Sequence, residues 1–175
     1  MKKQILILSL IFNLQLALAQ DMNFLIQQNG FRDIKLGSNI NDYPDFVKKN
    51  KKNEEYFGLS GSRYEYIYAG KKYDDINDNQ ILRIFVNTID DLIFEIEVIT
   101  TKDNGLENFM ELAYGKPTVS TASMKGWYPG TIRCRLTGDT DLFQNYFIEY
   151  EDVALVDLYF KRKVQADKEK AKKQF

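Results

Sequence analysis

Alternating apolar and polar residues form the commonest pattern in this chain, and they predict a protein built mainly from β-strands. Successive side chains of a strand point to opposite faces of a sheet, so alternation is expected where one face is buried and the other is wet. Short segments rich in Gly, Asn and Asp separate the alternating runs, which favours antiparallel pairing. The predicted strands are residues 31–36, 64–68, 81–86, 92–100, 120–128, 131–136, 143–150 and 153–160.

The strands at 81–86 and 92–100 should form a hairpin whose register follows from burial. The residues expected to face the core together are Leu82, Ile84, Val86, Leu92, Phe94, Ile96 and Val98. Pairing Ile84 with Phe94 keeps both apolar sets on one side of the sheet. The same register places Arg83 opposite Glu95, a favourable cross-strand charge pair on the wet face.

Two short segments have the spacing of helices. Asn41 and Asp42 can cap a helix from about Asp42 to Lys49, with Phe46 and Val47 facing inward. A second helix should begin at Asn104 and end at Gly115. Its apolar residues at helical spacing are Leu106, Phe109, Met110 and Ala113.

These elements predict an α+β protein: an antiparallel sheet with two short helices packed on one face and a polar C-terminal helix. Residues 20–160 should form a single domain. The tail, residues 161–175, favours a basic helix that projects or frays because no apolar stripe anchors it.

The first 19 residues have the order of a secretory signal. Lys2 and Lys3 precede an apolar run that ends at Ala17-Leu18-Ala19, a small-x-small cleavage site. The protein should therefore be exported and should be periplasmic or secreted. We expect no transmembrane segment after the signal is removed.

Histidine is absent, and Cys134 is the single cysteine. These two facts exclude Ser-His-Asp and Cys-His catalysis, most zinc sites and any intramolecular disulfide. We therefore expect no cofactor and no metal. Cys134 alternates with Ile132 and Leu136, which favours a buried thiol, with a reactive or intermolecular thiol as the alternative.

The net charge of −1 hides an uneven distribution. Residues 161–175 carry seven basic and two acidic residues, so the tail is basic and the body is strongly acidic. An acidic body argues against nucleic acid as the partner. The tail lysines could make a weak contact with an anionic surface, although a solvated terminus is the simpler explanation.

Two groups of aromatic and arginine residues are candidate binding sites. The candidates are Tyr64, Tyr66, Tyr68, Trp127, Tyr128, Arg133 and Arg135. The three tyrosines could stack on a sugar or contact a partner if they face solvent, and otherwise they belong to a half-buried sheet face. Aromatic residues beside arginine are enriched at binding hot spots, with an ordinary solvated strand as the alternative.

Acidic residues offer two further kinds of site. Asp75, Asn77 and Asn79 begin like a calcium loop, but Gln80 and Val86 replace its glycine and final glutamate, so an Asx-rich turn is favoured. Four carboxylates could pair in space as a glycosidase would require, although acidic residues on strands usually mark the wet face. They are Glu95, Glu97, Glu149 and Asp157.

Gly37-Ser38 before the first predicted helix and residues 112–117 (LAYGKP) at the end of the second carry a resemblance to a known group. Over Phe31 to Thr118 the chain resembles small exported bacterial envelope proteins of the β-lactamase-inhibitor-like or outer-membrane-assembly-lipoprotein-like type. It departs from them in lacking a lipoprotein cysteine and disulfides. The resemblance implies a non-catalytic protein-binding module and assigns no functional residue.

Together these observations predict an exported, non-catalytic interaction or inhibitor-like module of the bacterial cell envelope, and not an enzyme. Its partner should be another envelope or extracellular protein. The alternative is a small carbohydrate-binding or carbohydrate-active protein that uses surface tyrosines and carboxylates.

Overall fold

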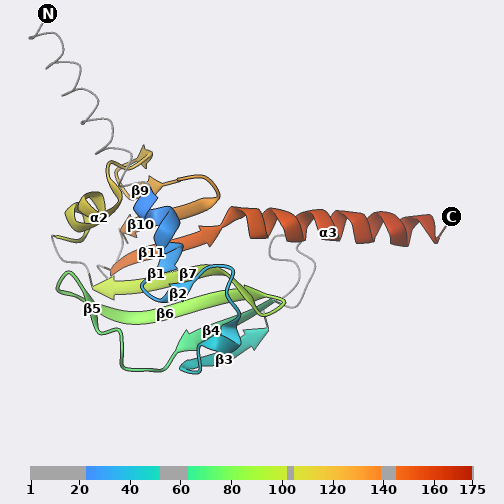
Figure 1. The fold of residues 1–175 in the computed structure, drawn as a ribbon, viewed down its shortest axis with the longest axis horizontal. Helices are drawn as coiled ribbons and strands as arrows, with labels where there is room; N and C mark the ends of the chain where they lie inside the picture. Colours follow the sequence, from blue (N-terminus) through green and yellow to red (C-terminus); the bar gives the residue numbers. More distant parts are fainter. Residues whose placement is uncertain (1–22, 52–62, 102–104, 139–144, 175) are drawn as a thin grey trace, which may run out of the picture.

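An antiparallel sheet of nine strands forms the centre of the structure and confirms the predicted α+β class (Figure 1). The computed structural model describes residues 23–51, 63–101, 105–138 and 145–174. The predicted signal segment, residues 1–19, lies outside the described residues.

The sheet is built mainly from strands that follow one another as hairpins. After a helical segment at 23–28, the elements are β1 (Gly30–Phe31), β2 (Ile34–Lys35), the 3₁₀ turn η1 (Ile40–Asp42), β3 (Phe46–Lys51), β4 (Arg63–Tyr68), β5 (Asp75–Ile76), β6 (Asn79–Ile89), β7 (Leu92–Thr101), α2 (Leu106–Tyr114), β8 (Val119–Ser120), β9 (Met124–Trp127), β10 (Ile132–Gly138), β11 (Asn145–Asp152) and α3 (Val153–Lys172). The spatial order is β3-β4-β6-β7-β11-β10-β9-β8, and β5 pairs with β6. Strands β1 and β2 form a separate two-stranded ribbon.

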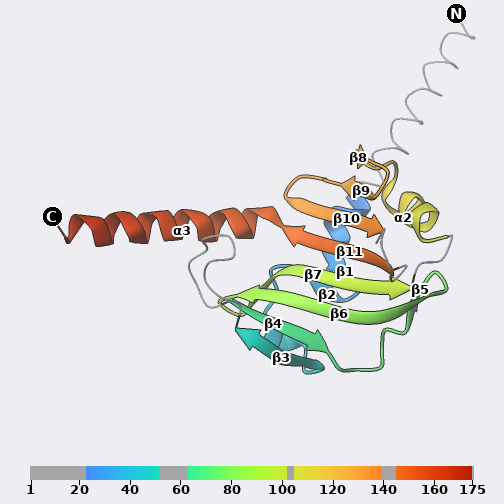
Figure 2. The same ribbon diagram turned by 180° about the vertical axis from the view of Figure 1, so that it is seen from behind.

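One face of the sheet is covered by the N-terminal segment and α2. Figure 1 shows the N-terminal segment in front of the strands, and Figure 2 shows the strands from behind with that segment beyond them. Apolar side chains from these elements and from the inner faces of the strands form the main core. Its completely buried members include Leu25, Ile34, Val86, Ile96, Val98, Leu106, Trp127, Cys134 and Ile148.

The single strand predicted at 31–36 is wrong, because the chain reverses direction within it. Strands β1 and β2 pair Phe31 with Ile34, so Arg32 and Asp33 form the turn. Arg32 has a left-handed φ of 54°, which is uncommon for a residue with a Cβ. The three-residue spacing from Phe31 to Ile34 still allows both side chains to be buried.

The helix predicted at 42–49 is also wrong. Asn39 caps only η1, and the chain then extends as β3, which pairs with β4. Phe46 is buried whereas Val47 is 54% exposed, the alternation of a strand. Pairing with β4 satisfies the backbone of this segment, and that tertiary interaction outweighs the local capping signal.

The hairpin of β6 and β7 forms, but its predicted register is wrong. Ile84 pairs with Val98 instead of Phe94, and Glu95 lies opposite Asn87 instead of Arg83. Irregularities between Ile81 and Arg83 and between Asn87 and Thr88 shift the pairing. As a result, Ile93 joins the main core, Phe94 joins a second cluster with Ile89 and Tyr159, and Leu82 is 44% exposed.

The remaining strand predictions mostly agree with the structure. Strands β4, β10 and β11 correspond to the predicted runs at 64–68, 131–136 and 143–150, with ends shifted by a few residues. The run predicted at 120–128 is divided into β8 and β9.

Helix α2 is confirmed at the predicted place. Leu106 and Met110 are buried, and Gly115 follows the helix with a positive φ of 77°. Phe109 differs from the prediction because 40% of it is exposed. The predicted cap Asn104 lies outside the described residues.

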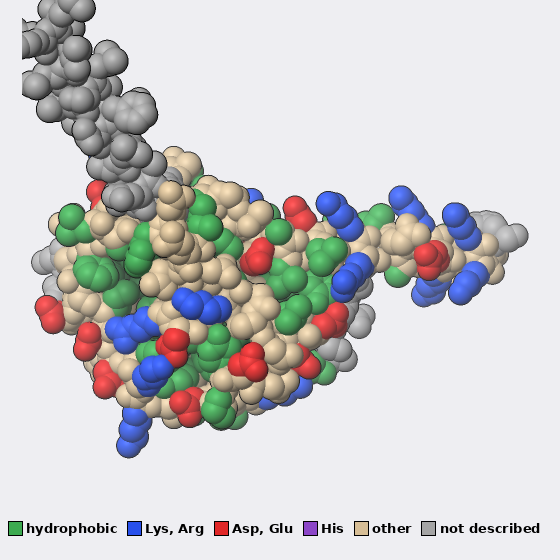
Figure 3. Space-filling view, viewed as in Figure 1, with side chains coloured by type: hydrophobic (Ala, Val, Ile, Leu, Met, Phe, Trp, Pro, Cys, Tyr) green, Lys and Arg blue, Asp and Glu red, His purple; other side chains and the backbone are tan. Residues whose placement is uncertain are grey.

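The last predicted strand, 153–160, is wrong, since these residues begin α3. The Asp152 side chain accepts a hydrogen bond from the Leu155 amide at 3.0 Å and caps the helix. Tyr159 is buried against the sheet, whereas Leu158 and Phe160 are about half exposed. The helix continues through the predicted helical tail and projects from the domain with basic side chains along its length (Figure 3).

In the described part of the chain, no helix combines the length and the apolar character needed to span a membrane.

Candidate functional site

One candidate surface is the face of β10, β11, β7 and β6 that points away from the main core. Ile132, Cys134 and Leu136 of β10 are buried in that core. Because strand side chains alternate, Arg133 and Arg135 point to the other side. We call this other side the open face, and it is the side seen in Figure 2.

Two rows of registered residues cross the open face. One row is Arg133, Glu151, Glu95 and Asn87, and the other is Arg135, Glu149, Glu97 and Phe85. A neighbouring apolar row contains Phe147 and Ile99, which are half-buried. Asn87 and Phe85, at the β6 end of these rows, are buried. The accessible part of the open face therefore lies on β10, β11 and β7, where arginines, half-buried glutamates and half-buried apolar groups stand in ordered lines.

Ion pairs connect β10 to β11 across this face. Arg135 Nε lies 3.0 Å from Glu149 Oε2, and its Nη2 lies 3.9 Å from Glu151 Oε2. Arg133 Nη1 lies 3.6 Å from Glu151 Oε2. A hydrogen bond connects β6 to β7 in the row of Arg133: the Asn87 amide donates to Glu95 Oε2 at 2.6 Å.

The structure brings together three of the four carboxylates considered as acid–base candidates. Glu97 and Glu149 lie directly opposite each other on β7 and β11, and Glu95 lies two residues from Glu97. Asp157 is exposed on α3 and is not part of this row. The three glutamates lie on a sheet surface among arginines, an arrangement suited to pairing with charged groups of another molecule.

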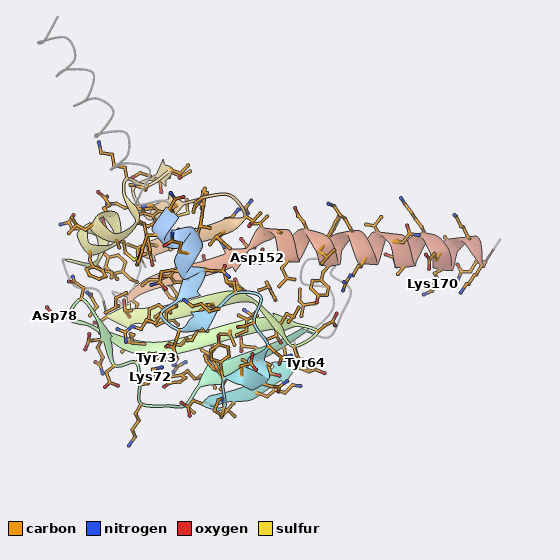
Figure 4. The ribbon with its side chains drawn as sticks, viewed as in Figure 1. Tyr64, Lys72, Tyr73, Asp78, Asp152 and Lys170 are labelled. Carbon is orange, nitrogen blue, oxygen red and sulfur yellow. The ribbon has the colours of Figure 1, made fainter. Side chains whose placement is uncertain are left out.

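The predicted tyrosine ladder does not form a solvent-facing platform. Tyr66 is 9% exposed and belongs to the main core, while Tyr64 and Tyr68 pack against that core as half-buried residues. Tyr64, labelled in Figure 4, lies on β4 near one edge of the sheet. The Lys48 ammonium lies 3.1 Å from the centre of its ring. The three tyrosines therefore belong to a half-buried sheet face, which was the alternative to a solvent-facing ladder in the sequence analysis.

Trp127 is separated from its predicted companions. It is completely buried, and its indole Nε1 donates to the Gly115 carbonyl at 2.8 Å. Tyr128 is half-exposed, with the Arg133 guanidinium 6.0 Å from its ring centre. The surface group therefore consists of Tyr128, Arg133 and Arg135, and Trp127 must be removed from it because it faces the core.

A hollow of about 180 Å³ lies between the N-terminal segment and the edge of the sheet. We call it the aromatic hollow, and it is lined by Asp33, Asp42, Tyr43, Pro44, Asp45, Phe46, Tyr68, Lys72 and Tyr73. The rings of Tyr68 and Tyr73 are 4.9 Å apart, and those of Phe46 and Tyr68 are 5.4 Å apart. Aromatic rings beside carboxylates are chemistry suited to polar ligands with apolar faces.

Asp33 organises the polar part of the aromatic hollow by binding Lys72 and Tyr73, which Figure 4 labels. The Tyr73 hydroxyl donates to Asp33 Oδ1, and Lys72 Nζ lies 2.5 Å from Asp33 Oδ2. These bonds from Lys72 and Tyr73 lower the pKa of Asp33. Burial and the neighbouring Asp33 carboxylate raise the pKa of Tyr73 above its ordinary value.

A larger cavity of about 260 Å³ lies on the covered face between residues 23–28, β1, the β5–β6 turn and α2. We call it the apolar pocket. Five aromatic residues line it, and the polar side chains Gln28, Arg32 and Asn77 join them; the aromatic residues are Phe24, Phe31, Phe109, Tyr114 and Tyr150. Sequence reasoning missed this pocket, because its walls come from segments that are distant in the chain.

The predicted Asx-rich turn at Asp75–Asn79 is the β5–β6 connection. Asn79 is completely buried, and its amide donates to Ile76 O at 3.2 Å and Asn77 O at 2.9 Å. These bonds hold the turn itself. The described residues contain no group of three or more acidic or cysteine side chains placed to hold a metal ion.

Cys134 is buried, as its alternation with Ile132 and Leu136 predicts. Burial raises the pKa of its thiol, which contacts the Tyr150 hydroxyl. The thiol therefore belongs to the core.

No protein-family model matches this sequence, and comparisons with curated proteins and with solved structures find no match either. The functional assignment therefore depends on the chemistry of the surfaces described above.

Proposed function

We propose that this protein is an exported, non-catalytic module of the cell envelope that binds another envelope or extracellular protein through the open face. The observation that carries the proposal is the pair of rows headed by Arg133 and Arg135, which place fixed positive and negative charges beside Phe147 and Ile99. The N-terminal signal pattern supports an address outside the cytoplasm.

The composition of the open face suits a protein partner. Arginine is enriched at binding hot spots, and ordered charges of both signs select a partner with the complementary pattern. The ion pairs between β10 and β11 hold Arg133 and Arg135 in place before binding, which reduces the entropy lost on association.

A non-catalytic role is supported by the chemistry that the chain lacks and by the position of its carboxylates. The absence of histidine removes the commonest general base at neutral pH. Glu95, Glu97 and Glu149 lie in a row on a partly solvated sheet face, whereas an acid–base pair works best in a site that excludes water.

The experiment is chemical cross-linking of the purified protein in envelope extract, followed by identification of the captured protein. Arg133→Glu should abolish capture of a specific partner, because it reverses a charge on the open face. Lys71→Glu makes the same change at an exposed turn residue away from the open face and should leave capture unchanged. Equal capture by both variants, or no specific partner at low salt, would contradict the proposal.

Carbohydrate binding is the second candidate function, and the aromatic hollow favours it. Tyr43, Tyr68 and Tyr73 line this hollow with Asp33 and Asp45, so ring stacking and hydroxyl recognition could act together. Glycan-array binding that is lost in Asp45→Asn but retained in Arg133→Glu would support this function. Array binding that is unchanged by Asp45→Asn would contradict it.

The basic residues of α3 could add a contact with an anionic surface. Lys170 lies far along the projecting helix (Figure 4). An anionic layer could attract such lysines at long range without packing closely against the helix.

A further inference from the structure

The apolar pocket lies on the covered side of the sheet, away from the open face. Its aromatic walls join three separate parts of the chain: the N-terminal segment, α2 and β11. The aromatic residues from these parts are Phe24 and Phe31, Phe109 and Tyr114, and Tyr150, respectively. Phe24 and Phe109 remain 41% and 40% exposed beside a cavity of about 260 Å³. Ligand pockets are typically concave and mostly apolar, with a few fixed polar groups.

Arg32 supplies the cationic group at the rim of the pocket. Arg32 lies in the turn at the tip of the β1–β2 ribbon and has a left-handed φ of 54°. The guanidinium carbon lies 5.4 Å from the Phe31 ring centre and 5.7 Å from the Tyr73 ring centre, and Nη2 donates to the Asp75 carbonyl at 2.5 Å. Packing between two rings and one carbonyl fixes the direction of this side chain.

The charge of Arg32 has no counterion in the described part of the chain. Its hydrogen bond goes to a neutral carbonyl, and the described ion pairs involve other cations. A guanidinium carries five N–H donors, so several remain available to an anion. A carboxylate is matched to guanidinium geometry because it accepts two parallel hydrogen bonds.

Asn77 also lines this cavity. It has a left-handed φ of 49° in the β5–β6 turn, and its carbonyl is already bonded to the Asn79 amide. Two residues in an uncommon backbone conformation thus border one pocket, and such residues concentrate at binding sites.

We propose that the apolar pocket binds a small amphipathic monocarboxylate, with its hydrocarbon part against Phe31, Phe109 and Tyr114 and its carboxylate paired with Arg32. The apolar walls supply affinity by removing hydrocarbon from water, and Arg32 selects the acid over neutral or cationic analogues. This site is independent of the open face, so it stands or fails separately from the proposed protein-binding function.

Trp127 provides a built-in reporter of binding. It is the single tryptophan of the chain, it is buried, and its ring packs edge-on against Tyr114 at a centroid distance of 6.0 Å. A ligand that contacts Tyr114 from the pocket side should therefore change the tryptophan emission.

The test titrates the purified protein with phenylbutyrate and follows Trp127 emission, with calorimetry as a second measurement. Phenylbutanol and phenylbutylamine are the neutral and cationic probes with the same hydrocarbon part. The carboxylate should bind at least about tenfold more tightly than either analogue, the scale expected of a charge-assisted hydrogen bond. Absence of binding in both measurements, or equal binding of the three probes, would overturn the proposal.

Three variants locate the ligand. Arg32→Gln should weaken phenylbutyrate binding about tenfold and leave phenylbutanol binding unchanged. Ala113→Leu fills the pocket from α2 and should weaken both probes, whereas Leu112→Gln changes an 83% exposed neighbour on the same helix and should have no effect. Thermal unfolding checks that each variant is folded. Carboxylate binding that persists unchanged in folded Arg32→Gln or folded Ala113→Leu would refute this location.

Discussion

The hydroxyl oxygens of Tyr114 and Tyr150 lie 3.0 Å apart in the buried core and connect α2 to β11. Replacing either tyrosine with Phe leaves the other hydroxyl buried without this partner, which should cost about 1–3 kcal/mol of unfolding free energy. The double variant should cost less than the sum of the single variants, because no unpaired member of the pair remains. Urea unfolding of the three variants measures this coupling, and strictly additive costs would contradict it.

Cys134 should be protected from thiol reagents in the folded protein. Burial raises the pKa of its thiol, so little reactive thiolate forms at mildly alkaline pH. Labelling should be slow under native conditions and fast after unfolding in denaturant, which serves as the control. Complete native labelling that is much faster than global unfolding would show that the thiol is accessible.

Asp33 should make a pH-dependent contribution to stability. Hydrogen bonds from Lys72 and Tyr73 lower its pKa from the ordinary value of 3.8, so folding favours the ionised form. The contribution is therefore complete above the unfolded pKa and is lost as pH falls through the lower folded pKa. Asp33→Asn should cost about 0.5–1 kcal/mol at neutral pH, a modest value because this pair is largely exposed and screened.

The measurement for Asp33 is urea unfolding of wild type and Asp33→Asn as a function of pH. The difference between them should be constant near neutrality and should shrink below about pH 4. Asp45→Asn is the control, because Asp45 lines the same hollow and forms no ion pair among the described residues. A difference for Asp33→Asn that grows as the pH falls would contradict the assignment.

Alanine substitutions at Gly30 and Gly37 should distinguish the energetic cost of a steric clash from that of backbone strain. Gly30 has φ of 141°, and a Cβ there would lie 2.3 Å from the Ile34 carbonyl oxygen. Gly37 has φ of 77°, with no atom within 4 Å of an added Cβ. Gly30→Ala should therefore cost about 3 kcal/mol or more and Gly37→Ala about 1 kcal/mol, measured by thermal or urea unfolding. Equal costs would mean that the ribbon moves to accommodate the methyl group.

The sequence predicted the parts of the fold that depend on local alternation. Burial of Cys134 follows from its position between Ile132 and Leu136, and the strand pattern there needs no tertiary information. The register of β6 and β7 depends instead on two irregularities in pairing, near Leu82 and near Thr88, which no local pattern specifies.

The strand predicted at residues 153–160 was wrong for a different reason. The run from Val153 to Phe160 alternates like a strand, yet Leu155 and Tyr159 also have the four-residue spacing of one helix face. Asp152 supplies a helix cap directly before them, a signal that could have decided between the two.

The candidate site residues also fall into two groups: some are placed by local alternation, and others depend on tertiary contacts. Arg133 and Arg135 were placed correctly on the outer side of their strand by alternation alone. Trp127 lies opposite Cys134 on β9, so its burial depends on the pairing of two strands. The apolar pocket depends on contacts between segments more than 70 positions apart, such as Phe31 and Phe109, and therefore emerges only in the folded chain.

Helix α3 should have two parts with different effects on stability. Tyr159 is buried with Ile89 and Phe94, and its hydroxyl donates to the Ile89 carbonyl at 3.2 Å. Tyr159→Ala should therefore cost about 3 kcal/mol or more, whereas Leu158→Ala, at the exposed neighbouring position, should cost less than about 1 kcal/mol.

Removal of residues 164–175 should change the unfolding free energy by less than about 0.5 kcal/mol, because the described side chains of this part are exposed. A projecting helix of this length is marginal in water, so its amides should exchange with solvent faster than those of β11. Urea unfolding and hydrogen exchange measure the two effects. A truncated protein that loses as much stability as Tyr159→Ala would show that the outer part of α3 packs against the domain in solution.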